Sequence, residues 1–288
     1  MSQETMPSQN DAGRIMGKAL ASQARRHTYC LIHGSDNAKI GTAVAVKLGE
    51  RYFLATAAHV IEDDTANVQA ILQNQVAVAV SNFVGRHYDL SADVGLLEVS
   101  ASDAHQFSFL EHTHLLETIE EQQQLPVIVV GFAGQFCGGA VETDLTPDTL
   151  LQMRFCNTLS YHTVVLPKSG WPPDGLPDEN CVCQMLTEGR DMLVDFQYRQ
   201  EVQPFTPRSC GGDNPTVECA SLDPHGISGG GIWLAQVTEG PERVSRPDAR
   251  LIGLQIGWHR TENVLRGVRI GAWLDLVREK YPDLEDTI

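Results

Sequence analysis

Gly226-Ile227-Ser228-Gly229-Gly230 is the stretch on which the interpretation of the fold depends; it lies between a turn signal, Asp223-Pro224, and a strand start, Gly231-Ile232-Trp233-Leu234. The glycines leave little bulk around the serine, and the glycine two residues before it lets the backbone aim its N–H groups outward. Such donors can hold the oxygen that becomes negative when a carbonyl group is attacked. Serine is a weak nucleophile at neutral pH, so this turn needs a base and a group that orients the base.

Two upstream stretches supply these groups. Phe53-Leu54-Ala55-Thr56-Ala57-Ala58-His59-Val60 places His59 at the end of an apolar strand. Ala92-Asp93-Val94-Gly95-Leu96-Leu97 places Asp93 at the head of another. Asp89, four residues before Asp93, is the alternative aspartate.

The order His59, Asp93, Ser228, with a strand signal beside each residue, resembles the chymotrypsin-like (trypsin-like) serine peptidases over roughly residues 27 to 275. The resemblance implies an all-β fold of two packed six-stranded antiparallel β-barrels with a C-terminal helix. It also implies a catalytic triad in which Ser228 is the nucleophile, His59 the base and Asp93 the orienting acid. The family places its aspartate directly before an apolar strand, which favours Asp93 over Asp89. The N–H groups of Gly226 and Ser228 would form the oxyanion hole.

Two positions depart from the family pattern. In the secreted digestive enzymes an aspartate directly precedes the serine and pairs with the newly cut N-terminus, whereas this chain has Ile227 there. Activation by that route is not expected, and packing of Ile227 is expected to set the turn instead. The pocket-floor position of the trypsin branch, six residues before the serine, is Leu222, so a preference for Lys or Arg is not implied unless Asp223 takes that place.

Gln255 lies on the strand that, by the resemblance, lines the substrate channel. It is a candidate substrate contact, and an ordinary strand glutamine is the open alternative. Leu222 is the other candidate substrate-binding residue.

Composition limits the classes of partner. The chain has 288 residues, a hydrophobic share of 42% and a formal net charge of −16. This acidity argues against nucleic acid and anionic membranes, which need a basic face. The polar first residues show no secretory signal, and no apolar run approaches the ~18 residues of a membrane span. A cytoplasmic location is therefore expected.

The seven cysteines are expected to be reduced, because an odd number in a cytoplasmic chain does not suggest a disulfide framework. Cys181, Cys183, Cys210 and Cys219 form an alternative metal set, but their spacing matches no standard zinc pattern. No metal and no cofactor are expected.

The organisation is predicted in five parts. They are an N-terminal extension, partly disordered or helical and dispensable for the site (1–26), a first β-barrel with His59 and Asp93 (27–104), a linker with a short helix around 114–123 (105–124), a second β-barrel with Ser228 (125–270), and a C-terminal helix and tail (271–288). The polar stretch 238–250 is expected to be an excursion between strands.

The resemblance implies a serine endopeptidase that acts through an acyl-enzyme on a protein or peptide substrate. A regulatory protein partner or signal is expected, because a cytoplasmic peptidase needs control and no inhibitory segment is visible. Two alternatives stay open: a catalytically weak binding or scaffold module of the same fold, and an esterase that uses the same site.

Overall fold

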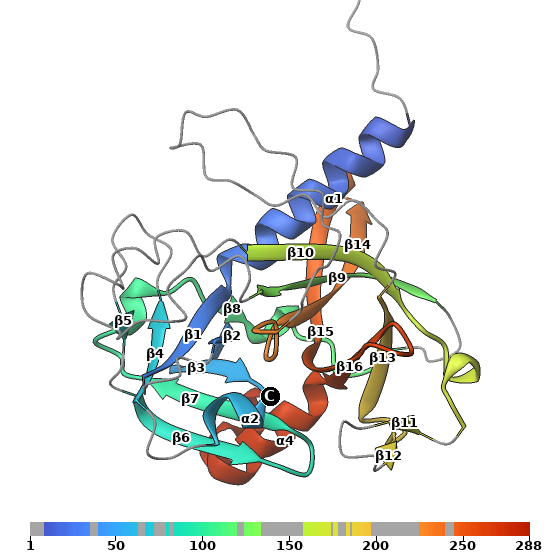
Figure 1. Cartoon of the computed structure of the whole chain (residues 1–288). Coiled ribbons are helices and arrows are strands. Elements are labelled where there is room, and N and C mark those ends of the chain that lie inside the picture. The colour runs from blue at the N-terminus through green and yellow to red at the C-terminus, as the bar shows by residue number, and fades with distance from the viewer. Residues whose placement is uncertain are drawn as a thin grey trace, which may run out of the picture.

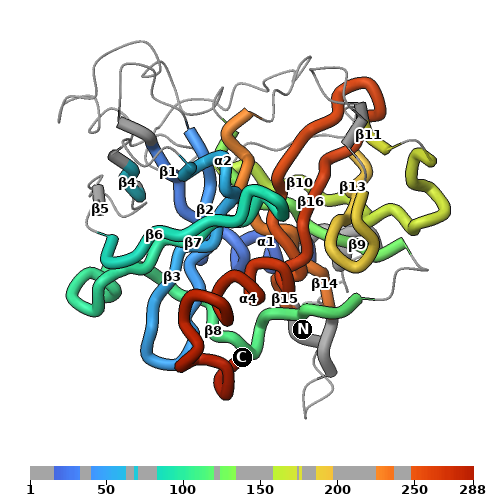
Figure 2. The backbone as a smooth tube through the Cα atoms, turned by 90° about the horizontal axis from the view of Figure 1, so that it is seen from below, coloured from blue at the N-terminus to red at the C-terminus, as the bar shows by residue number. Residues whose placement is uncertain are grey.

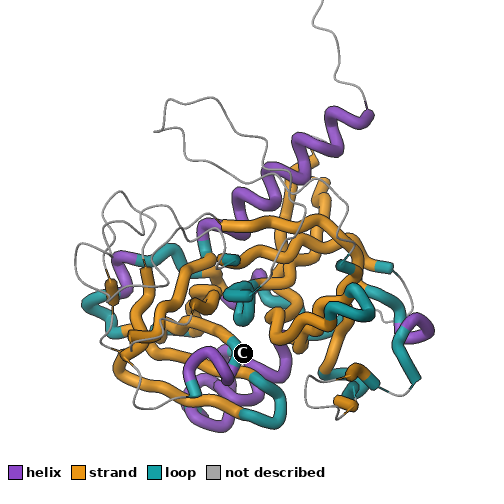
Figure 3. The backbone as a smooth tube through the Cα atoms, in the orientation of Figure 1, coloured by secondary structure: helices purple, strands orange, loops and turns teal. Residues whose placement is uncertain are grey.

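Strands dominate the computed structural model of the chain, and the helices lie at its periphery (Figures 1 and 3). The structure describes residues 9–34, 40–62, 67–71, 79–80, 83–119, 124–133, 158–173, 175–177, 183–184, 186–196, 225–239 and 245–288. Within these residues the strands form two lobes. The predicted all-β architecture with two packed β lobes and a C-terminal helix is confirmed.

The first lobe is a curled sheet with the strand order β5-β4-β1-β2-β3-β7-β6. Its strands are β1 (Thr28–Gly34), β2 (Ile40–Leu48), β3 (Arg51–Thr56), β4 (Asn67–Ile71), β5 (Ala79–Val80), β6 (Phe83–Asp89) and β7 (Val94–Val99), and β8 (Leu110–Glu111) pairs parallel to β2. Within the described residues its edge strands do not pair with each other, so this half is an open curled sheet rather than the closed six-stranded barrel that was expected.

The second lobe is a closed antiparallel barrel with the strand order β10-β13-β16-β15-β14-β9. Its strands are β9 (Leu125–Phe132), β10 (Thr158–Val165), β13 (Asp191–Asp195), β14 (Gly231–Glu239), β15 (Ser245–His259) and β16 (Val264–Arg269), with β11 (Leu176–Pro177) and β12 (Cys183–Gln184) as a separate pair. Residues 238–239 and 245–250 of the stretch predicted as a polar excursion extend the pairing of β14 with β15 instead, with Glu239 opposite Ser245, and residues 240–244 lie outside the described part of the chain. This stretch lacks the apolar alternation that indicates a strand, so sequence alone did not reveal the pairing.

The connection between the lobes contains less helix than predicted. Its described helices are the short η1 (Ala104–Gln106) and η2 (His112–His114). The other short helices lie in the lobes: α2 (Ala58–Ile61) in the first and η6 (Lys168–Gly170) in the second. After η2 the chain is extended, and the N–H of Leu116 donates to the carbonyl of Leu251 at 2.9 Å. Residues 120–123 of the predicted helix lie outside the described residues.

Helix α1 (Gln9–Arg26) crosses the second lobe and joins the core (Figure 1). Leu20, Ala21 and Ala24 are at most 3% exposed. The guanidinium of Arg25 donates to the Ser160 hydroxyl at 2.6 Å. The C-terminal half of this helix is therefore part of the folded body, and its removal would uncover apolar core, contrary to the dispensable extension expected from sequence. None of the described helices has the length and apolar character that a membrane crossing requires.

Helix α4 (Ile270–Lys280) lies against β6 and β7 of the first lobe and against β15 and β16 of the second (Figure 2). Trp273 is fully buried, and its indole N–H donates to the carbonyl of Gly95 at 3.1 Å. The helix ends before Pro282, which begins the 3₁₀ helix η7 (Pro282–Thr287). The predicted C-terminal helix is thus present, and it packs against both lobes.

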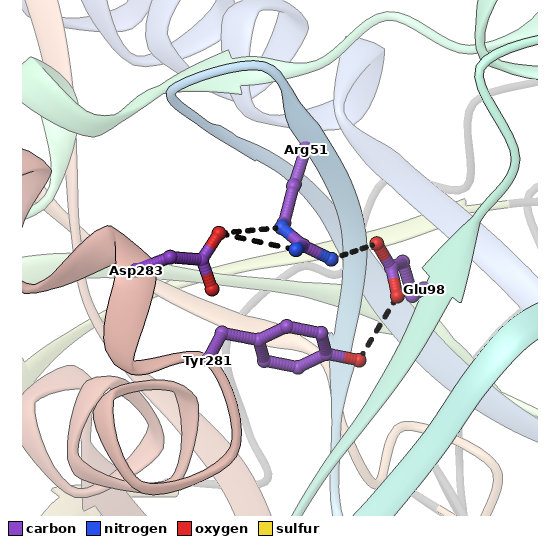
Figure 4. A network of polar contacts seen from close by, with 4 residues as sticks. All are labelled: Arg51, Glu98, Tyr281 and Asp283. Carbon is purple, nitrogen blue, oxygen red and sulfur yellow. Dashed lines mark hydrogen bonds and ion pairs between the residues drawn. The ribbon is translucent and has the colours of Figure 1, made fainter.

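A polar network fastens the end of this helix to the first sheet (Figure 4). Arg51 of β3 lies between two carboxylates, with its guanidinium 3.0 Å from Glu98 and 3.1 Å from Asp283. The Tyr281 hydroxyl donates to the second oxygen of Glu98 at 3.1 Å. Tyr281 is only 7% exposed, so this hydrogen bond is shielded from water.

Tyr281→Phe should lower the free energy of unfolding by about 1.5 kcal/mol at neutral pH, the usual contribution of a hydrogen bond to a charged group. Tyr52→Phe is the matched control, because the Tyr52 ring packs on Phe109 and its hydroxyl makes no hydrogen bond to the described residues. Urea unfolding of both variants measures the difference. Equal losses in the two variants would contradict the role of the Tyr281 hydroxyl.

The pH dependence of stability gives a second test. Burial and the neighbouring Glu98 carboxylate raise the pKa of the Tyr281 phenol. A tyrosine in the unfolded chain has a pKa of about 10. Above that pH the unfolded chain releases a proton that the folded chain keeps, so the free energy of unfolding falls as pH rises. The fall should be shallower in Tyr281→Phe than in the wild type, as measured by urea unfolding between neutral pH and about pH 11.

Candidate active site

His59 lies one turn beyond the end of β3, in the short helix α2. Its ring nitrogen Nδ1 is 2.8 Å from Oδ2 and 3.0 Å from Oδ1 of Asp93. The main-chain N–H of His59 also donates to Oδ1 of Asp93 at 3.0 Å. One carboxylate therefore fixes both the ring and the backbone of His59, with Nδ1 facing Asp93.

Asp93 lies in the tight turn between β6 and β7 and adopts a left-handed backbone with φ of 53°. Aspartate tolerates this conformation better than most residues. The side chains of His59 and Asp93 are 42% and 28% exposed, so the pair lies at the surface of the first lobe.

Asp89 shapes the same turn rather than pairing with His59. Its carboxylate accepts the N–H of Ser91 at 2.8 Å. Partial burial acts to raise the pKa of the Asp89 carboxyl, but the hydrogen bonds from Ser91 and the charge of Arg190 hold it below its ordinary value. Between the two candidate aspartates, the structure brings Asp93 to the histidine.

Ser228 lies in the turn that leads into β14, and its side chain is partly exposed. Gly226 and Gly229 on either side have φ of 95° and 86°, a conformation that favours glycine. Between them Ile227 is 2% exposed and packs into the core of the second lobe. The expectation that Ile227 is anchored by packing is confirmed.

The serine turn packs directly on the segment that carries His59. A Cβ atom on Gly229 would lie 2.0 Å from the carbonyl oxygen of Thr42, 2.3 Å from the Thr56 hydroxyl and 3.1 Å from the nitrogen of Ala57. Ala57 is only two residues before His59. Glycine is therefore required at position 229, because any side chain would push the two lobes apart at the site.

Gln255 of β15 holds the other side of this turn through its backbone. Its carbonyl accepts the N–H of Gly229 at 2.7 Å, and its N–H donates to the carbonyl of Gly230 at 2.8 Å. The Gln255 side chain is 2% exposed, and its amide donates to the carbonyl of Gly257 at 2.7 Å. The structure thus gives this residue a backbone role beside Ser228, with its side chain facing the interior.

Other predicted site residues lie outside the described part of the chain. These are the pocket-floor residue Leu222 and its neighbour Asp223, together with the cysteines Cys181, Cys210 and Cys219. Among the described residues no group of three or more His, Cys, Asp or Glu side chains is arranged to hold a metal ion.

Sequence reasoning missed Thr42, which contacts the serine turn from β2. Its N–H donates to the carbonyl of Ser228 at 2.8 Å, and its hydroxyl donates to the carbonyl of Gly226 at 2.8 Å. The available signal was weak: a polar residue within the otherwise apolar strand Gly41–Val46. Its partners are far away in the sequence, so no local pattern connects them.

No protein-family model matches the sequence, and no curated protein matches it. The structure, however, is similar to solved serine proteases. A serine endoprotease from Yersinia pestis aligns with a TM-score of 0.52 at 10% identity, over 96% of this chain and 67% of the other. A thermostable serine protease from an extremophilic microorganism aligns with a TM-score of 0.45 at 11% identity, over 87% and 95% of the two chains. A protein from Mycobacterium tuberculosis H37Rv, crystallised as an inactive serine-to-alanine mutant, gives 0.49 at 13% identity, over 96% of each chain.

The likeness to the Yersinia endoprotease establishes the fold. The closed barrel, the curled sheet and the C-terminal helix match the trypsin-like fold.

Gly229→Ala should lower the free energy of unfolding by roughly 3 kcal/mol or more, because it combines backbone strain with overpacking. Gly189→Ala is the matched control, because Gly189 has φ of 77° and a Cβ there would meet nothing within 4 Å. It should show the strain alone, about 1–2 kcal/mol. Urea unfolding measures both variants, and equal costs would contradict the close approach at Gly229.

Proposed function

We propose that this protein is a serine endopeptidase that cleaves peptide bonds through an acyl-enzyme on Ser228. One observation carries the proposal. Asp93 binds both the ring and the backbone of His59, while the Ser228 turn packs through Gly229 against Ala57, just before that histidine. The approach of the Ser228 turn to the segment that carries His59, whose ring binds Asp93, supports the proposal.

The reaction follows from these placements. The Ser228 hydroxyl oxygen attacks the substrate carbonyl carbon as His59 Nε2 takes the hydroxyl proton. His59 returns the proton to the nitrogen of the breaking C–N bond, and the amine leaves. Water then attacks the ester carbon as His59 takes a proton from it; the ester C–O bond breaks, His59 returns the proton to the Ser228 oxygen, and the carboxylic acid product leaves. Asp93 keeps the Nδ1 proton of His59 in place and stabilises the imidazolium that forms.

The backbone of the turn favours stabilisation of the oxyanion. The carbonyls of Gly226 and Ser228 both accept hydrogen bonds from Thr42, and that of Ile227 accepts the N–H of Gly230 at 2.6 Å. The N–H groups of Gly226 and Ser228 donate to no partner among the described residues. Free donors beside a nucleophile are what an oxyanion needs, since they do not have to break other bonds first.

An open sheet edge next to the serine supports a peptide substrate over a small ester. Strand β14 pairs with β15 only as far as Leu254, whereas β16 pairs with the other edge of β15 to His259. Among the described strands, none pairs with the β14-side edge of residues 256–258. An extended peptide can hydrogen-bond to such an edge as an added strand.

The proposal involves no metal or cofactor, since every step uses groups of the chain itself. A cytoplasmic location and control by a regulatory protein partner stay predictions of the sequence.

Ser228→Ala should abolish both turnover and labelling by a fluorophosphonate while leaving the fold intact, because the serine side chain is partly exposed and fills no core space. His59→Ala should reduce turnover to a similar degree. Casein and a nitrophenyl ester are the two substrates: cleavage of the ester alone would replace the peptidase with an esterase. A wild-type chain that reacts with neither the probe nor a substrate would point to a binding module.

Asp93→Asn should lower kcat by about 10⁴, because an asparagine favours the wrong histidine tautomer. Asp89→Asn is the matched control and should keep kcat within about tenfold of the wild type, since Asp89 binds the turn backbone. Steady-state kinetics on a fluorogenic peptide compares the two. A larger loss in Asp89→Asn than in Asp93→Asn would reverse the assignment.

A further inference from the structure

Thr42 connects four parts of the molecule from a completely buried position on β2. Its N–H and its hydroxyl bind the carbonyls on the two sides of the nucleophile turn, at Ser228 and Gly226. Its own carbonyl accepts the Thr56 hydroxyl at 2.7 Å, at the end of the strand that leads to His59. Its hydroxyl oxygen also accepts the N–H of Phe132 on β9 at 2.9 Å.

The direction of the hydroxyl proton follows from these partners. The N–H of Phe132 can only donate, so it occupies a lone pair of the Thr42 hydroxyl. The hydroxyl proton is then free to point at the carbonyl of Gly226, which can only accept. Both partners are backbone groups with fixed roles, so the Thr42 hydroxyl accepts from Phe132 and donates to Gly226.

These bonds set the orientation of the peptide units in the turn. In a trans peptide the C=O and the next N–H point in opposite directions. The carbonyls of Gly226, Ile227 and Ser228 are all engaged within the protein, two by Thr42 and one by Gly230. The N–H of Ser228 must therefore point away from the bond made by the Ile227 carbonyl. The position and the left-handed backbone of Gly226, with φ of 95°, are held through its bond to the Thr42 hydroxyl.

The sequence gives this turn no charged anchor of its own. Ile227 precedes the nucleophile and cannot form an ion pair, and it is 2% exposed in an apolar core. A Cβ on Gly131 would lie 2.8 Å from Ile227 and 3.2 Å from the Thr42 hydroxyl, so the isoleucine and the hydroxyl occupy adjoining space. Apolar packing fills this space without specifying the direction of a carbonyl, whereas a hydrogen bond specifies it.

We propose that Thr42 is a positioning residue for catalysis: by binding the Gly226 carbonyl, its hydroxyl fixes the backbone of Gly226 and thereby the direction of that residue's N–H toward the oxyanion. This inference rests on the proposed function of Ser228. Thr42 does not touch the substrate, and it acts only through the backbone of the turn.

Three variants separate positioning from simple stability. Thr42→Val keeps the shape and removes the hydroxyl, and Thr42→Ser keeps the hydroxyl. Thr28→Val is the matched control, because Thr28 is also buried at 1% exposure, and its hydroxyl donates to the carbonyl of Ala24 in α1 at 2.9 Å rather than to the serine turn. Thr42→Val and Thr28→Val should both lower the melting temperature.

The decisive measurements are kcat and KM for a fluorogenic peptide and the inhibition constant of a peptide aldehyde, which forms a tetrahedral adduct with the serine. Thr42→Val should lower kcat by roughly 10²–10³, the effect of losing one oxyanion donor, with KM changed by less than about threefold. Aldehyde affinity should fall in proportion to kcat/KM, because the adduct resembles the transition state. Thr42→Ser should recover kcat to within about fivefold of the wild type, and Thr28→Val should leave it unchanged.

The outcomes distinguish this inference from the function on which it rests. A wild-type chain that neither reacts with a fluorophosphonate nor cleaves peptides overturns the proposed function and this inference with it. A reactive wild type with Thr42→Val within threefold in kcat, or with Thr28→Val equally impaired, overturns only the role of Thr42. If Thr42→Val does not fold, Thr42→Ala is compared with Thr42→Ser under the same criterion.

Discussion

The close contact between the Gly229 backbone and the strand ends at Thr42 and Thr56 is the constraint on which the site depends. At this contact a Cβ would lie 2.0 Å from one oxygen and 2.3 Å from another, so the two lobes approach as closely as peptide backbones can. The glycine side of this contact carries no side chain, and its length is fixed by hydrogen bonds such as that from the Thr42 N–H to the Ser228 carbonyl. Groups from different lobes are thereby held in register.

Helices α1 and α4 stabilise this arrangement, because each packs against both lobes. Helix α4 contacts strands of both lobes, and α1 contacts β1 of the first lobe as well as β9, β10, β14 and β15 of the second. Both helices contribute apolar residues to the same large core, including Ala24 and Trp273. Trp273 also donates to the carbonyl of Gly95, two residues beyond Asp93. The position of the acid is thus tied to a helix that rests on the second lobe.

The sequence was informative wherever function coincided with a local pattern. His59 follows one apolar strand, Asp93 precedes another, and Ser228 lies in a glycine-rich turn. These three motifs carried the resemblance from which the fold and the approximate places of these residues were predicted. The roles of other residues depend on partners that are distant in the chain. The bond from Thr42 to Gly226 spans 184 positions, and the weak local signal, a polar residue in an apolar strand, does not identify that partner.

Departures from the predicted elements have related causes. Residues 245–250 are polar and lack an apolar period, yet backbone pairing with β14 makes them a strand. Helix α1 resembles a removable surface helix because its sequence mixes apolar and basic residues, but burial of Leu20 and Ala24 makes it structural. Long-range pairing and packing overrode local preference in both cases.

The serine turn is held by uncharged groups, Ile227 and Thr42, and not by a buried ion pair. The two hydrogen bonds from Thr42 contribute about 1 kcal/mol each to the stability of the folded turn. Burial of the Ile227 side chain contributes about 2–3 kcal/mol. The hydrogen bonds and the apolar burial are therefore of similar size. The Thr42 hydroxyl fixes the direction of the Gly226 carbonyl, and burial of Ile227 stabilises the turn. The two effects are complementary, which explains why a site without a charged residue at the turn combines them at adjoining positions.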